Sequence, residues 1–393
     1  MTSEGTRAVH AGLPAVRPGG PFGSSPVFAS TFHLSGDPEG PFQYGRYANP
    51  TWIALEEAIG ELEGAASTVT FASGMAAVSG TLLALAEPGS TVVLPSDGYP
   101  ATRAVGDHLA ARGVTVRLAP TAADAQAAAL RGAGLVWLET PSNPGLDVCD
   151  IARLCELAHA EGALVAVDNT LATPLGQTPL ALGADISVAS GTKALTGHSD
   201  VLLGYVACAD QAVADRVRGW RTLSGGIPGP MEAWLAHRSL ATLHLRVDRQ
   251  AANAVALATW LRGRPEVTGV RHPGLADDPA HAVAARQMRR YGCVVVFTLP
   301  DREHAERFLD ALRMTAVATS FGATHSMAER RGRWPGDDVF PGFIRFSVGC
   351  EDADDVIADV ARALDVALDS ALDAALDAAL GKDDGEAPGQ DPR

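Results

Sequence analysis

Short apolar runs alternate with helical windows through most of the chain. Trp52, Leu55, Ile59 and Leu62 recur at helical spacing and predict a helix that begins near residue 52. The runs that follow are almost entirely apolar, as is typical of strands buried on both faces of a largely parallel sheet. These predicted strands are 91–94, 114–118, 135–138, 163–167, 186–189 and 204–208. The pattern predicts an α/β domain, in which ligands gather beyond the carboxyl ends of the strands.

The pattern changes after a Gly/Pro-rich stretch at 221–230. A long helical segment follows, and then come predicted strands at 293–299 and 343–348 with a helix at 301–312 between them. This combination predicts a second, smaller α+β domain. The predicted divisions of the chain are an N-terminal arm at 1–50, the α/β domain at 51–235, the α+β domain at 236–365 and a C-terminal extension at 366–393.

The C-terminal extension is expected to carry no chemistry. Leucines recur every four residues from Leu364 to Leu380, and this spacing advances about 40° per step, so the stripe winds slowly around a helix. The acidic segment 381–393 is predicted to be disordered. The N-terminal arm is rich in Gly and Pro and shows no sustained period, which predicts an extended conformation.

Charge and cysteine content exclude several classes of partner. The chain has 393 residues and a formal net charge of −15, which disfavours nucleic acid and anionic membrane as partners and favours a small polar substrate. No apolar segment reaches the ~18 to 20 residues of a membrane span, and none resembles a signal peptide, so we expect a cytoplasmic protein. The five cysteines lack a Cys-x-x-Cys pair, so neither a disulfide framework nor a metal site is expected.

A lysine and an aspartate follow two of the predicted strands. Lys193 lies among small residues after the strand 186–189, and lysine forms a Schiff base only as the free amine, a form favoured by burial. Asp168 ends the run 163–167, where a buried carboxylate needs a matching cation such as a protonated pyridine nitrogen. A cofactor with an aldehyde, a pyridine nitrogen and a phosphate suits this pair. The pattern therefore indicates pyridoxal 5′-phosphate.

Other segments supply candidate contacts to the same cofactor. Gly74 lies in a turn that leads into a predicted helix at 75–86, and a glycine there lets backbone N–H groups at a helix N-terminus approach a phosphate. Ser190 and Thr192 are candidate hydroxyl donors to that phosphate. Tyr99 follows the strand 91–94 and is a candidate to stack on a planar ring. Arg345 lies inside the strand 343–348, where a guanidinium suits a planar substrate carboxylate.

Each of these residues also has a simpler structural interpretation. Taken alone, Lys193 is compatible with a solvated or salt-bridged lysine, and Asp168 with a carboxylate that caps the next turn. Tyr99 is compatible with a packed loop tyrosine, and Arg345 with an internal salt bridge. The sequence shows no Gly-x-Gly-x-x-Gly, no Walker lysine loop, no His-Glu-x-x-His and no Gly-x-Ser-x-Gly motif that would indicate a different chemistry.

Together these segments resemble the trans-sulfuration, or cysteine/methionine-metabolism, family of pyridoxal-phosphate enzymes over residues 6–365. The family includes cystathionine γ-lyase, cystathionine γ-synthase, cystathionine β-lyase and methionine γ-lyase. The resemblance rests on motifs in the family's order and spacing. These are Tyr44-Gly45-Arg46, Asn49-Pro50-Thr51, Ser73-Gly74-Met75, Glu139-Thr140-Pro141-Ser142-Asn143-Pro144, Asp168-Asn169-Thr170, Ser190-Gly191-Thr192-Lys193 and Arg345-Phe346-Ser347-Val348-Gly349.

The resemblance implies an aminotransferase-like fold of type I, with a large, mostly parallel-sheet domain and a smaller α+β domain, assembled as a homotetramer of two dimers. It implies that Lys193 carries the Schiff base, that Asp168 contacts the pyridine nitrogen and that Tyr99 stacks on the ring. The other implied cofactor contacts are Asn143 near the phenolic oxygen, Gly74, Met75, Ser190 and Thr192 at the phosphate, and Tyr44 and Arg46 reaching in from the arm of the neighbouring subunit. The implied substrate contacts are Arg345, Ser320 and Asn143.

The implied reaction is carbon–sulfur cleavage, with cystathionine γ-lyase the leading candidate and Lys193 and Tyr99 moving protons. Cystathionine γ-synthase shares the early steps and is the alternative, followed by methionine γ-lyase. The sequence departs from the family's patterns at two places. No cysteine follows Tyr99, which disfavours methionine γ-lyase, and His325 stands where relatives that act on cystathionine often have an acid. The arginine-rich loop at 330–333 is expected either to meet a distal carboxylate or to be solvated.

Overall fold

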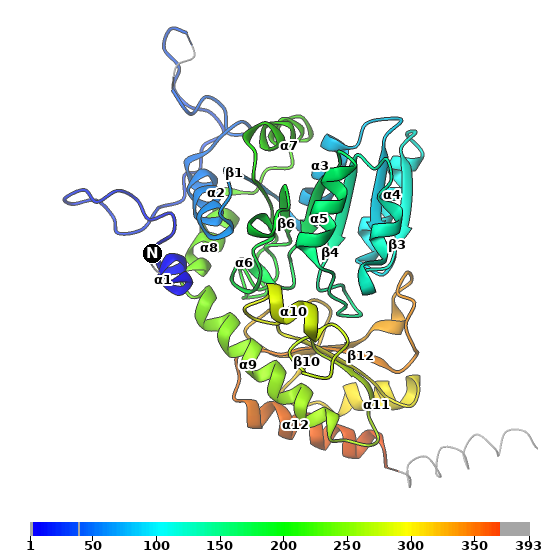
Figure 1. Ribbon diagram of the computed structural model, residues 1–393. Helices are drawn as coiled ribbons and strands as arrows, with labels where there is room; N and C mark the ends of the chain where they lie inside the picture. The colour runs from blue at the N-terminus through cyan, green and yellow to red at the C-terminus, as the bar shows by residue number, and fades with distance from the viewer. Residues whose placement is uncertain (1–2, 38–39, 370–393) are drawn as a thin grey trace, which may run out of the picture.

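The computed structural model describes residues 3–37 and 40–369, in which two β-sheets form the centres of two layered units (Figure 1). The strands of the larger sheet are β1 Ser67–Phe71, β2 Thr91–Pro95, β3 Thr115–Ala119, β4 Leu135–Glu139, β5 Leu164–Asp168, β6 Ile186–Ala189 and β7 Gly204–Cys208. Those of the smaller sheet are β8 Thr268–Arg271, β9 Val294–Thr298, β10 Ala316–Val317, β11 Met327–Arg330 and β12 Phe343–Ser347.

Helices lie on both sides of the larger sheet and on one side of the smaller one (Figure 1). In chain order the α-helices are α1 Glu4–His10, α2 Pro50–Glu63, α3 Gly74–Leu85, α4 Pro100–Ala110, α5 Ile151–Ala160, α6 Thr173–Gly176, α7 Gln211–Ser224, α8 Pro230–Leu240, α9 Leu243–Arg262, α10 His281–Gln287, α11 Arg302–Ala311 and α12 Ala353–Ala367. Short 3₁₀-helices are η1 Ala122–Ala129, η2 Pro179–Leu182 and η3 Arg331–Arg333. No helix in the described ranges combines the length and apolar character needed to cross a membrane.

The larger sheet is mostly parallel, as predicted. Its strand order is β1-β7-β6-β5-β4-β2-β3, and the strands from β3 to β6 pair in parallel while β7 runs antiparallel to both β6 and β1. Strand β1 was not among the predicted strands because threonines interrupt its apolar pattern. The structure buries Thr70 with Glu56, whose Oε1 accepts the Thr70 N–H at 2.8 Å and the Thr70 hydroxyl at 3.0 Å.

Alternate residues of each central strand pack on opposite faces of the sheet. On β4, Leu135 and Trp137 join the apolar cluster under α3, α4 and α7, whereas Val136 and Leu138 join the cluster under α5. Burial on both faces explains why these runs are apolar throughout. The carboxylates Glu139 and Asp168 stand at the carboxyl ends of the parallel strands β4 and β5, on one edge of the sheet.

The same alternation orients the smaller sheet toward the larger unit. On β12, Ile344 and Phe346 pack beneath α9, α11 and α12, so the intervening Arg345 must point to the other face. On β9 the residues of that other face, Val294 and Val296, pack with Leu171 of the larger unit. Arg345 is therefore directed between the two units by the two-residue period of its strand.

Three features of the structure differ from the elements and divisions predicted from the sequence. The arm contains the short helix α1, and residues 221–224 of the Gly/Pro-rich stretch belong to α7. The division predicted at 235/236 falls inside α8, whose Ala233, Ala236 and Leu240 share an apolar cluster with Leu55 of α2. The leucine stripe is described only as far as Leu368, and the rest of the C-terminal extension lies outside the described residues.

Candidate active site

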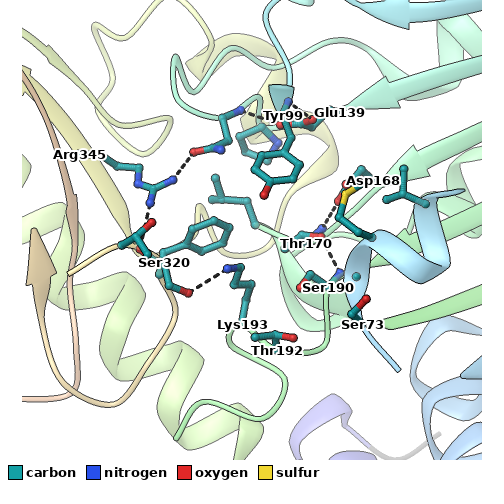
Figure 2. A pocket seen from close by; sticks show the side chains of 18 of the residues that line it. Ser73, Tyr99, Glu139, Asp168, Thr170, Ser190, Thr192, Lys193, Ser320 and Arg345 are labelled. Carbon is teal, nitrogen blue, oxygen red and sulfur yellow. Dashed lines mark hydrogen bonds between the residues drawn. The ribbon is translucent and has the colours of Figure 1, made fainter. Parts of the chain in front are cut away.

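A cavity of about 320 Å³ is lined by residues from both units (Figure 2). All but two of the residues predicted to contact the cofactor or the substrate line it, although they come from many parts of the chain. Those that line the cavity are Gly74, Met75, Tyr99, Asn143, Asp168, Ser190, Thr192, Lys193, Ser320 and Arg345. The strand ends of β4, β5 and β6 form its floor, in agreement with the expectation that ligands gather at the carboxyl edge of a parallel sheet.

Lys193 lies in the turn that follows β6. Its ammonium group donates a hydrogen bond of 2.9 Å to the Ser320 hydroxyl and lies 5.1 Å from the centre of the Phe321 ring. Burial, followed by the positive charge of Arg345, lowers the pKa of Lys193 from 10.5 to about 8. The lysine is half-buried, and no carboxylate in the described ranges forms an ion pair with it. With this pKa, about a tenth of it is the free amine at pH 7, far more than for an ordinary lysine.

Asp168 ends β5 at the floor of the cavity. Its Oδ1 accepts the backbone N–H of Thr170 at 3.0 Å, so the simpler interpretation of a capping carboxylate is also correct. Burial raises the pKa of Asp168, opposed by the hydrogen bonds from Thr170 and by the charge of Lys193. A buried carboxylate in this situation is stabilised as an anion by an added cation.

The N-terminus of α3 forms a cradle at one end of the cavity. Ser73 caps the helix, its hydroxyl accepting the Ala76 N–H at 3.1 Å. A Cβ at Gly74 would lie 2.6 Å from Cβ of Ser190, so only glycine lets these two segments approach. The free N–H groups of the first helical turn then lie beside the Ser190 side chain, which is an arrangement suited to an anion.

Thr192 lines the cavity, but its hydroxyl already has partners. It donates to the Leu203 carbonyl at 3.2 Å and accepts the Leu203 N–H at 2.9 Å. One hydroxyl hydrogen cannot serve two acceptors equally well, so Thr192 would have to release Leu203 to donate to a phosphate. Sequence alone gave no sign of this competing interaction.

Arg345 was interpreted either as a ligand of the substrate carboxylate or as part of an internal salt bridge, and the structure is compatible with both. Its guanidinium forms an internal salt bridge with Glu329, the residue directly opposite it on β11. It also donates to Oδ1 of Asn143 at 2.6 Å and to the Ser320 carbonyl at 3.1 Å. Ser320 holds an unusual backbone φ of +92°, so one strained residue contacts both Arg345 and Lys193.

Tyr44 and Arg46 do not line the cavity of this chain. Tyr44 is 44% exposed, and the Arg46 guanidinium lies over the rings of Tyr44 and Tyr47 at 5.5 and 4.9 Å. Arg46 also donates to the Thr222 carbonyl at 2.8 Å. Both residues belong to the N-terminal arm, which precedes α2.

Several cavity residues were not singled out from the sequence. Thr170 follows Asp168 in a quoted motif, and its hydroxyl accepts the Ser190 N–H at 2.8 Å. Arg331 also lines the cavity; it belongs to the loop at 330–333, which was expected either to meet a distal carboxylate or to be solvated. Arg331 is 5% exposed and is bound by Glu329 and Asp337. His325 does not line the cavity, and its Nε2 lies 3.5 Å from the Ser199 hydroxyl.

The residues present fit pyridoxal 5′-phosphate. Three groups occur around one cavity. They are the amine of Lys193 with its lowered pKa, the carboxylate of Asp168, and the N-terminus of α3, where Gly74 allows close approach to Ser190. These are the groups that an aldehyde, a pyridinium and a phosphate require. Together with the mostly parallel sheet, they define a pyridoxal-phosphate-dependent enzyme of the aminotransferase-like fold.

Comparisons with known proteins identify the family. Residues 6–365 match the family described as "Cys/Met metabolism PLP-dependent enzyme". A Streptomyces coelicolor protein named "Putative cystathionine gamma-lyase" is 64% identical, with 92% of this chain and 93% of that protein aligned. The cystathionine gamma-synthase of Mycobacterium tuberculosis is 37% identical, with 93% and 97% aligned.

A solved structure agrees with these matches. The crystal structure of CalE6 from Micromonospora echinospora superposes with a TM-score of 0.88 at 39% identity and covers 93% of this chain and 99% of that one. CalE6 is described in this structure as a cystathionine gamma-lyase and in a second structure as a methionine gamma-lyase. This chain belongs to the Cys/Met metabolism family of pyridoxal-phosphate-dependent enzymes. The fold class and the cofactor predicted from the sequence are thereby confirmed.

Proposed function

We propose that this enzyme is a carbon–sulfur lyase that cleaves cystathionine by γ-elimination. Cystathionine and water would give cysteine, 2-oxobutanoate and ammonia. The observation that carries the proposal is one cavity in which Lys193, Asp168 and Arg345 converge, since it offers an amine, an anion and a carboxylate site within reach of one amino acid. The 64% identity to the Streptomyces protein favours the lyase.

Arg345, Lys193 and Tyr99 would have different roles in this reaction. Bound pyridoxal phosphate supplies an electron sink that stabilises negative charge at the substrate Cα. Arg345, oriented by Asn143 and Ser320, would bind the α-carboxylate. Lys193 in its neutral form would take the Cα proton. Loss of a second proton from Cβ would then supply the electron pair that expels the γ-sulfur, and Lys193 or Tyr99 would give a proton to the departing sulfur.

The cofactor contacts are proposed from the same geometry. Asp168 would hold the pyridine nitrogen, Tyr99 would stack on the ring and Asn143 would lie near the phenolic oxygen. The first turn of α3 offers N–H groups to the phosphate, and the Ser190 side chain lies beside that turn. The full proposed set is Lys193, Asp168, Tyr99, Asn143, Gly74, Met75, Ser190 and Thr192, with Tyr44 and Arg46 from a second subunit.

Product analysis tests the proposed reaction against its alternative. A γ-synthase would join cysteine to an acylated homoserine, an option favoured by the synthase named among the relatives. With cystathionine alone, we expect cysteine, 2-oxobutanoate and ammonia in equal amounts, because each turnover cleaves one Cγ–S bond and releases one amine. Methionine serves as the control for a methionine γ-lyase.

The outcomes separate the three activities clearly. Formation of cystathionine from O-acylhomoserine and cysteine, with no 2-oxobutanoate from cystathionine, would identify the synthase and overturn the lyase. Faster release of 2-oxobutanoate from methionine than from cystathionine would instead favour the methionine γ-lyase. Chromatography of the products together with an assay for 2-oxo acids measures all three.

We further propose that the active sites are completed between subunits of a homotetramer built from two dimers, in the cytoplasm. Support comes from the arm, whose Tyr44 and Arg46 do not line the cavity of their own chain and whose Phe22 and Phe28 are exposed by 86% and 67%. A second copy of the chain would cover this apolar surface and bring Arg46 to the phosphate end of its partner's cavity.

Mixed subunits test this arrangement. Hybrids of Lys193→Ala subunits with Arg46→Ala subunits are expected to regain activity, because half of the sites in each hybrid dimer combine an intact Lys193 with an intact Arg46. Random mixing should restore roughly a quarter of the wild-type rate, since half of the dimers are hybrid. The rate is measured after co-refolding, with each variant alone as control. Hybrids verified by mass that stay as inactive as the parents would show that each site is built from one chain.

A further inference from the structure

One buried carboxylate joins two loops of the cavity. Glu139 ends β4 and is 5% exposed. Its Oε2 accepts the backbone N–H of Tyr99 at 2.7 Å, and its Oε1 accepts the backbone N–H of Asn143 at 2.9 Å (Figure 2). Tyr99 lies after β2 and Asn143 lies after β4, so the two N–H groups belong to different segments. Each carboxylate oxygen therefore fixes the backbone of a different residue of the proposed cofactor site.

The loop before Tyr99 is shaped around this carboxylate. A Cβ at Gly98 would lie 2.7 Å from Oε2 of Glu139 and 2.7 Å from Cγ of Pro95. Any side chain at position 98 would consequently push the carboxylate away from the Tyr99 N–H. Glycine is required here by close approach, because the tightest neighbours are a carboxylate oxygen and a proline ring.

The two loops carry groups with different proposed roles, one toward the cofactor and one toward the substrate. The Tyr99 ring is proposed to stack on the cofactor, while Oδ1 of Asn143 accepts a hydrogen bond of 2.6 Å from Arg345, the proposed ligand of the substrate carboxylate. A shift of Glu139 would therefore move a cofactor contact and a substrate contact together. No other carboxylate in the described ranges accepts the backbone N–H groups of both loops.

We propose that Glu139 is a positioning residue that sets the Tyr99 ring against the cofactor and, through Asn143, the Arg345 guanidinium against the substrate carboxylate. The inference rests on the proposed function, because it deepens the roles given there to Tyr99, Asn143 and Arg345. Glu139 itself does not need to touch the reacting atoms.

Burial and the neighbouring charges both affect the ionisation of Glu139. Burial, followed by the charge of Asp168, its cross-strand neighbour on β5, raises the pKa of Glu139 to about 8, and Asp97 in the loop after β2 adds to this. The hydrogen bonds from the two backbone N–H groups act in the opposite direction. Lys193 faces Asp168 from the turn after β6. A cation placed at Asp168 would offset the repulsion between the two carboxylates. A cation bound at Asp168 would therefore lower the pKa of Glu139 and increase the fraction of its ionised, doubly accepting form.

Glu139→Gln is the direct test. Glutamine offers one acceptor oxygen and turns an NH₂ group toward the other N–H, so one loop is released. We expect the KM for substrate to rise roughly tenfold, as for loss of one buried hydrogen bond at a binding group. We also expect the circular dichroism of the bound cofactor, measured without substrate, to change because Tyr99 shifts. This second signal needs no turnover and stays informative if the proposed reaction is wrong.

Two further variants separate positioning from general stability. Glu63→Gln is the matched control, because Glu63 is 1% exposed and bonds Tyr205 and Ser187 away from the cavity. It should lower the melting temperature without changing KM or the cofactor dichroism. Gly98→Ala should reproduce the Glu139→Gln effects by displacing the carboxylate without removing it. It also provides the test if Glu139→Gln fails to fold.

The proposal is overturned if the Glu139→Gln and Gly98→Ala enzymes keep the wild-type KM and dichroism and lose only melting temperature, as the Glu63→Gln control does. A second outcome is that the variants show altered dichroism while the wild-type enzyme turns over none of the substrates. This outcome would support the positioning role and reject the lyase. Normal wild-type turnover with unaltered dichroism in both variants would support the lyase and reject the positioning role.

Discussion

Replacing Lys193 by alanine is expected to remove turnover and the visible absorbance that pyridoxal phosphate gains when it is joined to a lysine. The amine lies in the cavity beside Ser320 and has a pKa of about 8, so it is suited both to attach the cofactor and to take a proton. Loss of a general base alone slows reactions by roughly 10²- to 10⁴-fold, and loss of the attachment adds to this. Absorbance spectra and steady-state rates measure the two effects separately.

Lys193→Arg is the control for charge. It keeps a cation near Arg345 and Asp168 but cannot form the linkage, so it should fail as the alanine variant does. The pKa gives a second check: since only the neutral amine reacts, attachment of added cofactor to cofactor-free wild-type enzyme should quicken as the pH rises and level off above a pH of about 8. Turnover retained by Lys193→Ala would remove this residue from its proposed role.

Asp168→Asn is expected to cause the second large loss. At ~4 Å and an effective dielectric of ~20, attraction between a carboxylate and a pyridinium is about 4 kcal/mol, which corresponds to a factor on the order of 10³ in rate or cofactor affinity. Asparagine fills the same space but carries no charge, so the pyridine nitrogen would lose the anion that keeps it protonated. Equilibrium dialysis with pyridoxal phosphate and steady-state rates measure the effect.

Asp185→Asn provides the matched control for this loss of charge. Asp185 lies before β6, at the end of the sheet opposite the cavity, and accepts the Val165 N–H at 2.7 Å and a hydrogen bond of 2.9 Å from His159. Its substitution should lower thermal stability and leave cofactor affinity unchanged. Equal effects of the two substitutions on cofactor affinity would mean that Asp168 acts only through stability and not through the cofactor.

Local patterns in the sequence predicted much of the fold. The strands β6 and β7 have the predicted bounds, and β2, β4 and β5 differ from theirs by one or two residues. Apolar runs are reliable here because both faces of the central sheet are covered by helices. Strand β1 was missed because threonines interrupt its apolar pattern, and the burial of Thr70 depends on Glu56 from α2, a contact that no local pattern contains.

Site residues could be predicted where a residue type is seldom found at such a position unless it has a specific role. Lys193 among small residues, Asp168 at a strand end and Gly74 before a helix were all found, because backbone geometry limits what can stand there. Glu139 was quoted only as part of a motif, and two interpretations stayed open for the loop that contains Arg331. Their importance depends on partners such as Gly98 and Glu329, and such pairings arise only when distant segments pack together.

The sequence by itself determined the alternation of strands and helices, the family and the chemical groups available for pyridoxal phosphate, since these depend on local periodicity and on residue type. Only the tertiary structure decided which partner each group has. It engaged the Thr192 hydroxyl with Leu203, paired Arg345 with Glu329, and held Tyr99 and Asn143 on one carboxylate. The physical reason is that a buried polar group must find its hydrogen-bond partner in space, and long-range packing chooses that partner.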